Sequence, residues 1–242
     1  MLDLPDRTLI LGHRGAPFEA PENTFGGFRL AVEHGADGVE LDVQRSADGA
    51  PVVIHDLTLD RTTDGTGEVR AHSWAELAGL SAGPGEPLRR LGEVADWAAG
   101  AGAWLNVELK GEGTEAATLA SLERAGVLER SIVSSFLPTV VLEVGKLAPG
   151  VRRALVTEFW DDTVAGLVRD SGAGGVCIHR GLATPERLAE LAAAGLSVVV
   201  WTVDDPAEVR ALLRAGVAAI ITNDPRRAVQ VKREEEGRAG SG

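Results

Sequence analysis

Two histidines stand at the ends of short apolar runs, where a strand would deliver them to a loop. His13 follows the run Thr8–Gly12, and His55 ends the run Val52–His55. An unperturbed imidazole has a pKa of about 6.5, so either side chain can give or take a proton at neutral pH. Two imidazoles at equivalent strand ends predict a general base and a general acid that work on one substrate.

Three carboxylates occupy alternating positions in two further apolar runs. Glu40 and Asp42 are two residues apart, and Glu108 alternates with Asn106 and Lys110. Residues i and i+2 of a strand share a face, so each set points one way. Two carboxylates about 4 Å apart repel by roughly 4 kcal/mol at an effective dielectric near 20. Either some carry protons or a cation sits among them, and oxygen ligands suit Mg²⁺ or Ca²⁺. The pattern favours a metal over solvated strand-end charges.

Arg14 and Lys110 supply the fixed positive charges that an anionic substrate requires. A guanidinium fork and an ammonium both match phosphoryl oxygens. A metal, an arginine and a lysine around one small anion favour phosphate-ester chemistry over carboxylate or sugar chemistry. Trp201 lies in the apolar run 197–203 and is expected to point inward as an apolar wall for the organic part of the substrate. His179 also ends a strand, but it has no paired partner in the sequence.

The elements that would position these residues alternate regularly. Short β-branched runs are separated by helical stretches rich in Ala, Leu and Glu, which is typical of a parallel sheet. The predicted strands are Thr8–Gly12, Gly38–Gln44, Val52–His55, Trp104–Leu109, Ile132–Phe136, Arg153–Thr157, Gly175–His179, Ser197–Val203 and Ala218–Thr222. Eight βα units over 242 residues favour a closed (β/α)8 TIM barrel with Trp201 on its seventh strand.

One segment interrupts this rhythm. Residues 57–88 contain turn-forming Gly and Pro and only a short helical pattern, so they predict an excursion after the second strand on the active-site side. Residues 1–230 are expected to form one domain. Residues 231–242 are charged and end in Gly and Ser, and they are expected to form a disordered tail.

Composition narrows the class of protein. The formal net charge is −12, which weighs against nucleic acid and anionic lipid as main partners. Cys177 is the single cysteine, so no intrachain disulfide is possible, and its apolar neighbours predict a small buried side chain. The first residues lack the pattern of a secretory leader, and no apolar run is long enough to span a membrane. We therefore expect a cytoplasmic protein without stable membrane insertion, and the sequence leaves the oligomeric state open.

Eight short motifs occur in an order that resembles the glycerophosphodiester phosphodiesterase family, from about residue 8 to residue 225. They are Gly12-His13-Arg14-Gly15, Pro21-Glu22-Asn23-Thr24, Glu40-Leu41-Asp42-Val43, His55-Asp56, Arg61-Thr62-Thr63, Glu108-Leu109-Lys110, Ser135-Phe136 and Trp201-Thr202-Val203.

The resemblance implies a barrel with a small excursion after the second strand, and it implies residue roles. Residues matching Glu40, Asp42 and Glu108 would hold a divalent metal, either Mg²⁺ or Ca²⁺. His13 and His55 would be the catalytic pair, and Arg14 and Lys110 would bind the phosphate. Glu22 and Asn23 are expected mainly to start the first helix, with a role beside the metal or behind its ligands as the alternative.

The sequence differs from the residues that are usual in the motifs of the family at three positions. Ser46 stands where Thr is usual, Asp204 where Asn is usual, and Asn223 where Asp is usual. Each replacement keeps an oxygen that can cap a turn or a helix. We expect the catalytic set to be unaffected and the charge at the rim to change.

The reaction implied is hydrolysis of a glycerophosphodiester, a small-molecule substrate, to an alcohol and sn-glycerol 3-phosphate. His13 would act as base toward the glycerol 2-hydroxyl or water, and His55 would protonate the leaving alcohol. A lysophospholipase D-type or other lipid phosphodiesterase is the nearest alternative, although the sequence shows no obvious apolar rim. A catalytically silent barrel that binds a phosphorylated ligand and a metal-dependent isomerase or aldolase are the others.

Overall fold

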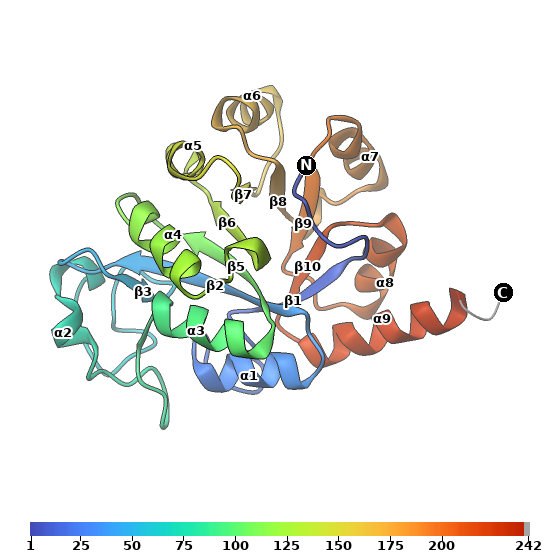
Figure 1. Ribbon diagram of the computed structural model, residues 1–242. Coiled ribbons are helices and arrows are strands. Elements are labelled where there is room, and N and C mark those ends of the chain that lie inside the picture. Colours follow the sequence, from blue (N-terminus) through green and yellow to red (C-terminus); the bar gives the residue numbers. More distant parts are fainter. Residues whose placement is uncertain (240–242) are drawn as a thin grey trace.

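Eight parallel strands close into a barrel in the computed structural model, which describes residues 1–239 (Figure 1). The strands are β1 (Leu9–His13), β2 (Gly38–Arg45), β5 (Trp104–Leu109), β6 (Ser131–Ser135), β7 (Arg152–Thr157), β8 (Gly175–His179), β9 (Ser197–Trp201) and β10 (Ala219–Thr222). Each pairs with the next in that order, and β1 pairs in parallel with both β2 and β10, which closes the barrel. The prediction of a TIM barrel is confirmed, and Trp201 ends its seventh strand.

Helices cover the outside of the barrel (Figure 1). They are α1 (Phe25–Glu33), α3 (Leu91–Ala101), α4 (Glu115–Arg124), α5 (Pro138–Leu147), α6 (Asp162–Ser171), α7 (Pro185–Ala193), α8 (Pro206–Ala215) and α9 (Pro225–Ala239). Side-chain oxygens of Asp161, Thr184 and Asp205 cap the first turns of α6, α7 and α8. Single-turn 3₁₀ helices follow or precede strands at Leu128–Arg130 and Arg180–Leu182. Among residues 1–239, none of the helices combines the length and the apolar character that a membrane span needs.

Strand alternation sorts the side chains into two cores. Val39, Leu41 and Val43 of β2 belong to the larger core between the strands and the helices. The barrel interior is filled separately, by residues that include Leu9, Leu11, Cys177, Val199 and Ile221. Glu40 and Asp42 alternate with the outward-facing residues of β2 and therefore face the barrel axis.

The excursion lies between β2 and α3 and projects to one side of the barrel (Figure 1). It contains β3 (Pro51–Val53), a 3₁₀ turn (Val69–Ala71), α2 (Trp74–Leu77) and β4 (Arg89–Arg90). A small core of its own includes Ile54, Leu59 and Leu77. Strand β3 runs antiparallel to β2, so the run Val52–His55 is not a barrel strand, contrary to the sequence prediction. His55 therefore comes from the excursion rather than from the end of a parallel strand.

The expected disordered tail is a helix over most of its length. Residues 231–239 continue α9, and Val231 is buried. The charged residues that suggested disorder form ion pairs with α8: Glu235 lies 2.7 Å from Arg214 and 3.0 Å from Arg210. Lys232 also donates a hydrogen bond to the carbonyl of Thr8 at 2.7 Å. Residues 240–242 lie outside the described part of the chain.

Candidate active site

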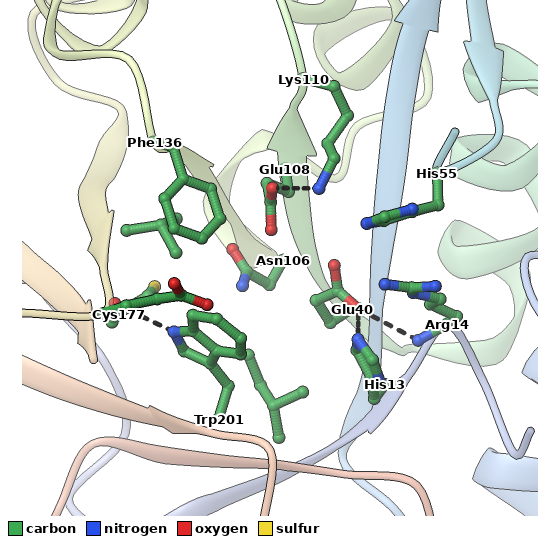
Figure 2. A pocket seen from close by; sticks show the side chains of 13 residues that line it. His13, Arg14, Glu40, His55, Asn106, Glu108, Lys110, Phe136, Cys177 and Trp201 are labelled. Carbon is green, nitrogen blue, oxygen red and sulfur yellow. Dashed lines mark hydrogen bonds and ion pairs between the residues drawn. The ribbon is translucent and has the colours of Figure 1, made fainter. Parts of the chain in front are cut away.

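A pocket of about 180 Å³ opens at the carboxyl ends of the barrel strands. Seven of the eight site residues predicted from the sequence line it, all except Asp42: His13, Arg14, Glu40, His55, Glu108, Lys110 and Trp201. Figure 2 shows the two histidines and Arg14 on one side, Phe136 and Trp201 on the other, and Glu108 and Asn106 between them. Residues from separate strands and from the excursion thus meet around one cavity.

Glu40, Asp42 and Glu108 form the acidic centre of the site. One carboxylate oxygen of each lies within 4.8 Å of one oxygen of each of the others. The register of β2 against β5 pairs Asp42 directly with Glu108, which explains the convergence. Burial raises the pKa of Glu40 well above its ordinary value, and the neighbouring charges of Asp42 and Glu108 add to this. Three buried oxygen donors that repel one another are a donor set that fits a hard divalent cation.

Arg14 and Lys110 contact the carboxylates of the acidic centre. The backbone N–H of Arg14 donates to Glu40 Oε2 at 3.0 Å, and its Nε lies 3.1 Å from Asp42 Oδ2. Lys110 Nζ lies 3.2 Å from Asp42 Oδ1 and 2.6 Å from Glu108 Oε1. Burial opposes the ionisation of Asp42, but Lys110 and Arg14 outweigh it and lower the pKa of this carboxyl. If all three carboxylates ionise, they exceed the two cations by one negative charge, and burial relieves this excess in the metal-free protein by favouring the protonated form of Glu40. A divalent cation among the carboxylates would turn this balance to one positive charge.

The loop after β1 is shaped to hold this arrangement. Arg14 has a φ of 53°, which non-glycine residues adopt rarely. Gly15 follows with a φ of 100°, and a Cβ there would lie 2.6 Å from the backbone of Gly27 in α1. The close approach of the loop to α1 therefore requires glycine at position 15, and it turns the N–H of Arg14 toward Glu40.

The two histidines have different partners. His13 Nδ1 lies 2.7 Å from Asn223 Oδ1, and Asn223 Nδ2 in turn donates to Asp204 Oδ2 at 2.8 Å. Because the amide nitrogen of Asn223 is used on Asp204, its oxygen accepts from Nδ1–H of His13, and the unprotonated Nε2 faces Glu40 at 3.9 Å. Burial lowers the pKa of His13, and the charge of Arg14 lowers it further.

His55 is paired with a carboxylate instead. Its Nδ1 lies 2.6 Å from Asp56 Oδ1. Arg61 of the excursion donates to both oxygens of Asp56, at 2.6 and 2.9 Å, and holds the pKa of that carboxyl well below its usual range. Asp56 is therefore an ionised acceptor, so Nδ1 of His55 carries the proton and Nε2 is directed to the pocket.

Two residues of the segment before α1 do more than start that helix. Thr24, not Asn23, caps α1 by accepting from Gly27 N. Asn23 is buried with a φ of 57°, which Asn tolerates, and its amide donates to Asp42 Oδ2 at 2.9 Å. Glu22 accepts from Arg14 Nη1 at 3.0 Å and from two nitrogens of Arg61 at 2.8 and 2.9 Å. The expectation that both serve mainly as a helix start is wrong, because neither their spacing nor the pattern of apolar residues reports these long-range partners.

The wall opposite the histidines is aromatic. The indole Nε1 of Trp201 donates to the carbonyl of Cys177 at 3.1 Å, and Phe136 packs edge-on against the indole with 5.8 Å between ring centres. Cys177 is buried, as expected, and lines the floor of the pocket. His179 packs against Trp201 without lining the pocket. Phe136 and Glu158 line the pocket without having been assigned to it from the sequence, although Phe136 ends a predicted strand and Glu158 directly follows one.

The exchanged Asp204 and Asn223 also meet at this site. Thr222 Oγ1 and the backbone N–H of Asn223 both donate to Asp204 Oδ1, at 3.0 and 2.7 Å. Their effect was expected at the rim, but Asn223 contacts His13 directly. The exchange of Asp and Asn therefore places a neutral amide against the imidazole of His13. The negative charge lies on Asp204, which binds the nitrogen of that amide.

Comparison with known proteins identifies the same family by sequence and by structure. The model of the "Glycerophosphoryl diester phosphodiesterase family" matches residues 13–227. A glycerophosphodiester phosphodiesterase of Caldanaerobacter subterraneus is 33% identical over 246 residues, which cover 94% of this chain and 99% of the relative.

Solved structures agree with this match. A glycerophosphodiester phosphodiesterase of Agrobacterium tumefaciens superposes with a TM-score of 0.81 at 32% identity, covering 91% of this chain and 98% of that one. A phosphodiesterase of Oleispira antarctica, solved in complex with the product sn-glycerol-3-phosphate, superposes with a TM-score of 0.84 at 29% identity, covering 95% and 97%.

Proposed function

The chain belongs to the glycerophosphoryl diester phosphodiesterase family and is an enzyme that hydrolyses glycerophosphodiesters, and we propose that it does so with His13 as base and His55 as acid. Membership of this family excludes two of the alternative functions, a metal-dependent isomerase or aldolase and a catalytically silent barrel that binds a phosphorylated ligand. The observation that carries the proposal is the pair of imidazoles with unequal partners on either side of a cluster of carboxylates and cations.

The unequal partners assign the two roles. The amide oxygen of Asn223 accepts from Nδ1–H of His13 at 2.7 Å, and burial lowers the pKa of His13, so its neutral imidazole can take a proton on Nε2. Asp56 Oδ1 lies 2.6 Å from Nδ1 of His55 and orients the ring, so that Nε2 faces the pocket and can give a proton to the leaving oxygen.

The cations and carboxylates bind the reacting phosphate between the imidazoles. Arg14 and Lys110 attract the nonbridging oxygens, and their ion pairs with Asp42 fix where they point. Glu40, Asp42 and Glu108 would hold a Mg²⁺ or Ca²⁺ ion, which would supply Lewis-acid stabilisation of charge on the phosphoryl oxygens. Phe136 and Trp201 exclude water from the organic part of the substrate.

The proton transfers balance in a simple sequence. His13 accepts the proton of the attacking hydroxyl, which is the glycerol 2-hydroxyl or water, as the new P–O bond forms. His55 gives its proton to the leaving alcohol as the other P–O bond breaks. Attack by the 2-hydroxyl produces a cyclic phosphate, which water opens to sn-glycerol 3-phosphate, and attack by water produces it directly.

A coupled assay for released sn-glycerol 3-phosphate tests this function. We expect release from glycerophosphocholine, -ethanolamine, -glycerol or -inositol in the presence of Mg²⁺ or Ca²⁺. Chromatography of early time points for a cyclic phosphate distinguishes the two nucleophiles. Failure to release glycerol phosphate from all four diesters would overturn the proposal.

Lysophospholipids are a second candidate substrate because the βα loops carry exposed apolar side chains. Phe18 and Phe159 are 65% and 63% exposed, and Phe136 is 42% exposed at the pocket itself. These loops follow β1, β7 and β6, so they lie at the carboxyl end of the barrel, where the sequence predicted no apolar rim. Release of choline from lysophosphatidylcholine at a rate comparable to that from glycerophosphocholine would favour this substrate, and a rate below about a hundredth of it would exclude it.

Arg61 binds the carboxylates that contact His55 and Arg14, and we expect it to act as a positioning residue. Its guanidinium binds Asp56, which holds His55, and Glu22, which holds Arg14. We expect Arg61→Gln to lower kcat about 10- to 100-fold, as loss of such outer partners commonly does, with a smaller change in KM. Arg61→Lys should recover part of the rate because it retains the charge.

The matched control is Arg70→Gln in the same excursion, because Arg70 pairs only with the exposed Glu68 among the described residues. Its kcat should equal that of the unaltered enzyme. Equal kcat values for Arg61→Gln and Arg70→Gln, at equal melting temperatures, would contradict the positioning role.

A further inference from the structure

Glu158 is an unpartnered carboxylate in the pocket. It lines the cavity beside Val156, which precedes it by two residues at the end of β7. Glu40 accepts from the backbone of Arg14, and Glu108 pairs with Lys110, whereas Glu158 has no hydrogen bond or ion pair with any residue in the range 1–239. An exposed carboxylate that faces a substrate cavity and has no protein cation is available to a cation on the substrate.

The backbone on either side of Glu158 is fixed. Thr157 is buried, and its Oγ1 both donates to the carbonyl of Phe159 at 2.6 Å and accepts from the N–H of Phe159 at 3.3 Å. This turn closes around Glu158 and sets the direction in which its side chain leaves the strand. The carboxylate is therefore presented by a rigid turn rather than by a free loop.

Two aromatic rings complete the same half of the pocket. Phe136, Glu158 and Trp201 follow or end β6, β7 and β9, while Arg14 and Lys110 come from the opposite half, after β1 and β5. The hydrogen bond from Trp201 to Cys177 and the edge-on contact with Phe136 hold the rings in place (Figure 2). Lys110 Nζ lies 5.8 Å from the centre of the Phe136 ring, so Phe136 lies where the two halves of the pocket meet. Aromatic faces and a carboxylate together are a chemistry that binds ammonium groups.

We propose, building on the function above, that Glu158 with Phe136 and Trp201 forms a subsite for a positively charged alcohol. A zwitterionic diester would place its phosphate against Arg14 and Lys110 and its ammonium group against Glu158. The subsite thus selects choline- and ethanolamine-type head groups over uncharged polyols. Glu158 sets this preference and takes no part in the proton transfers.

The test compares kcat/KM for two diesters with a cationic head group, glycerophosphocholine and glycerophosphoethanolamine, with kcat/KM for two whose head group is uncharged, glycerophosphoglycerol and glycerophosphoinositol. Glu158→Gln keeps the size of the side chain and removes its charge. Loss of an exposed ion pair of this kind predicts a fall in kcat/KM of about 2- to 5-fold for the diesters with a cationic head group. For the diesters with an uncharged head group, kcat/KM should change less than twofold. Glu158→Lys should lower kcat/KM further for the diesters with a cationic head group. Added salt should reduce the preference of the unaltered enzyme for cationic over uncharged head groups.

Glu123→Gln is the matched control, because Glu123 is exposed on the outer helix α4 and the substitution removes the same charge outside the pocket. It should leave the preference unchanged. The same ammonium head group also occurs on lysophospholipids, so lysophosphatidylcholine and lysophosphatidylglycerol are measured in parallel. The class of substrate, glycerophosphodiester or lysophospholipid, in which Glu158→Gln lowers kcat/KM selectively for the cationic head group is the natural source of that head group.

Equal falls for all four diesters in Glu158→Gln would overturn the subsite, because they would mean that Glu158 binds the shared glycerol or acts structurally. That result would leave the hydrolytic function intact. Absence of glycerol phosphate release by the unaltered enzyme would instead refute the proposed function itself.

Discussion

We expect His55→Ala to lower kcat about 10²- to 10⁴-fold on glycerophosphocholine, and His13→Ala to do the same, because each would remove one of the two proposed proton-transfer groups. Neither variant should lose more than about 1 kcal/mol of unfolding free energy, since both imidazoles are partly exposed at the pocket and only one hydrogen bond is lost in each case. Steady-state rates and chemical denaturation of both variants check this pair of expectations.

A change of leaving group separates the two roles. A diester that releases p-nitrophenol needs little protonation of the leaving oxygen, so His55→Ala should regain most of its rate on that substrate. His13→Ala should remain slow on both substrates, because the attacking hydroxyl still has to lose its proton. The opposite pattern would exchange the roles, and full activity of both variants would exclude histidine catalysis at this site.

His72→Ala provides the matched control. His72 lies in the excursion, and among the described residues its imidazole hydrogen-bonds only to the carbonyl of Thr66, at 3.3 Å. Its loss should leave kcat unchanged on either substrate.

We expect removal of divalent metal to abolish activity, and excess Mg²⁺ or Ca²⁺ to restore it. The reason is electrostatic: without the cation, the site lacks two positive charges, and the carboxylates offset Arg14 and Lys110, which must bind the phosphodiester anion. Full activity after exhaustive treatment with a chelator would contradict the metal assignment. The ion that restores the rate at the lower concentration identifies the preferred metal.

Glu40→Gln tests the same site without an activity measurement. An ion that binds only the folded chain raises its stability, by about 2.7 kcal/mol at a concentration 100-fold above its dissociation constant. The melting temperature of the unaltered protein should therefore rise with divalent ion, and that of Glu40→Gln should respond much less.

The metal-free protein gives a second readout. Burial and the charges of Asp42 and Glu108 disfavour an ionised Glu40, so metal-free Glu40→Gln should be no less stable than the unaltered protein. Glu123→Gln, on the outer surface, should keep the full response to metal. An equal response in Glu40→Gln would show that the ion binds elsewhere.

The sequence was sufficient for the barrel and for most of the charged centre. Strand alternation alone places Glu40 and Asp42 on the face opposite Val39 and Leu41, and the parallel register then sets Glu108 beside Asp42. Regular alternation of strands and helices predicts the closed sheet because each unit is local in the chain. The three carboxylates of the acidic centre therefore follow from the pattern of residues along two strands.

Other parts of the site depend on contacts between distant segments. His13 and Asn223 are 210 residues apart and meet only because β1 pairs with β10 when the barrel closes. His55 reaches the pocket from an antiparallel strand, and its orientation depends on Asp56 and Arg61, which no periodicity predicts. The helical tail was missed because its charges are neutralised by α8, which lies beside it only in the folded chain.

The fold and the residue types that carry the chemistry could thus be predicted from the sequence, because both follow from local periodicity and from the alternation of side chains along a strand. Tertiary structure alone decided which imidazole has a neutral partner and which has an anionic one. It also decided that Glu158, among the described residues, is the pocket carboxylate that has neither a hydrogen bond nor an ion pair. These properties arise from the pairing of surfaces distant in the chain, where charge and hydrogen-bonding capacity are balanced only after the barrel has closed.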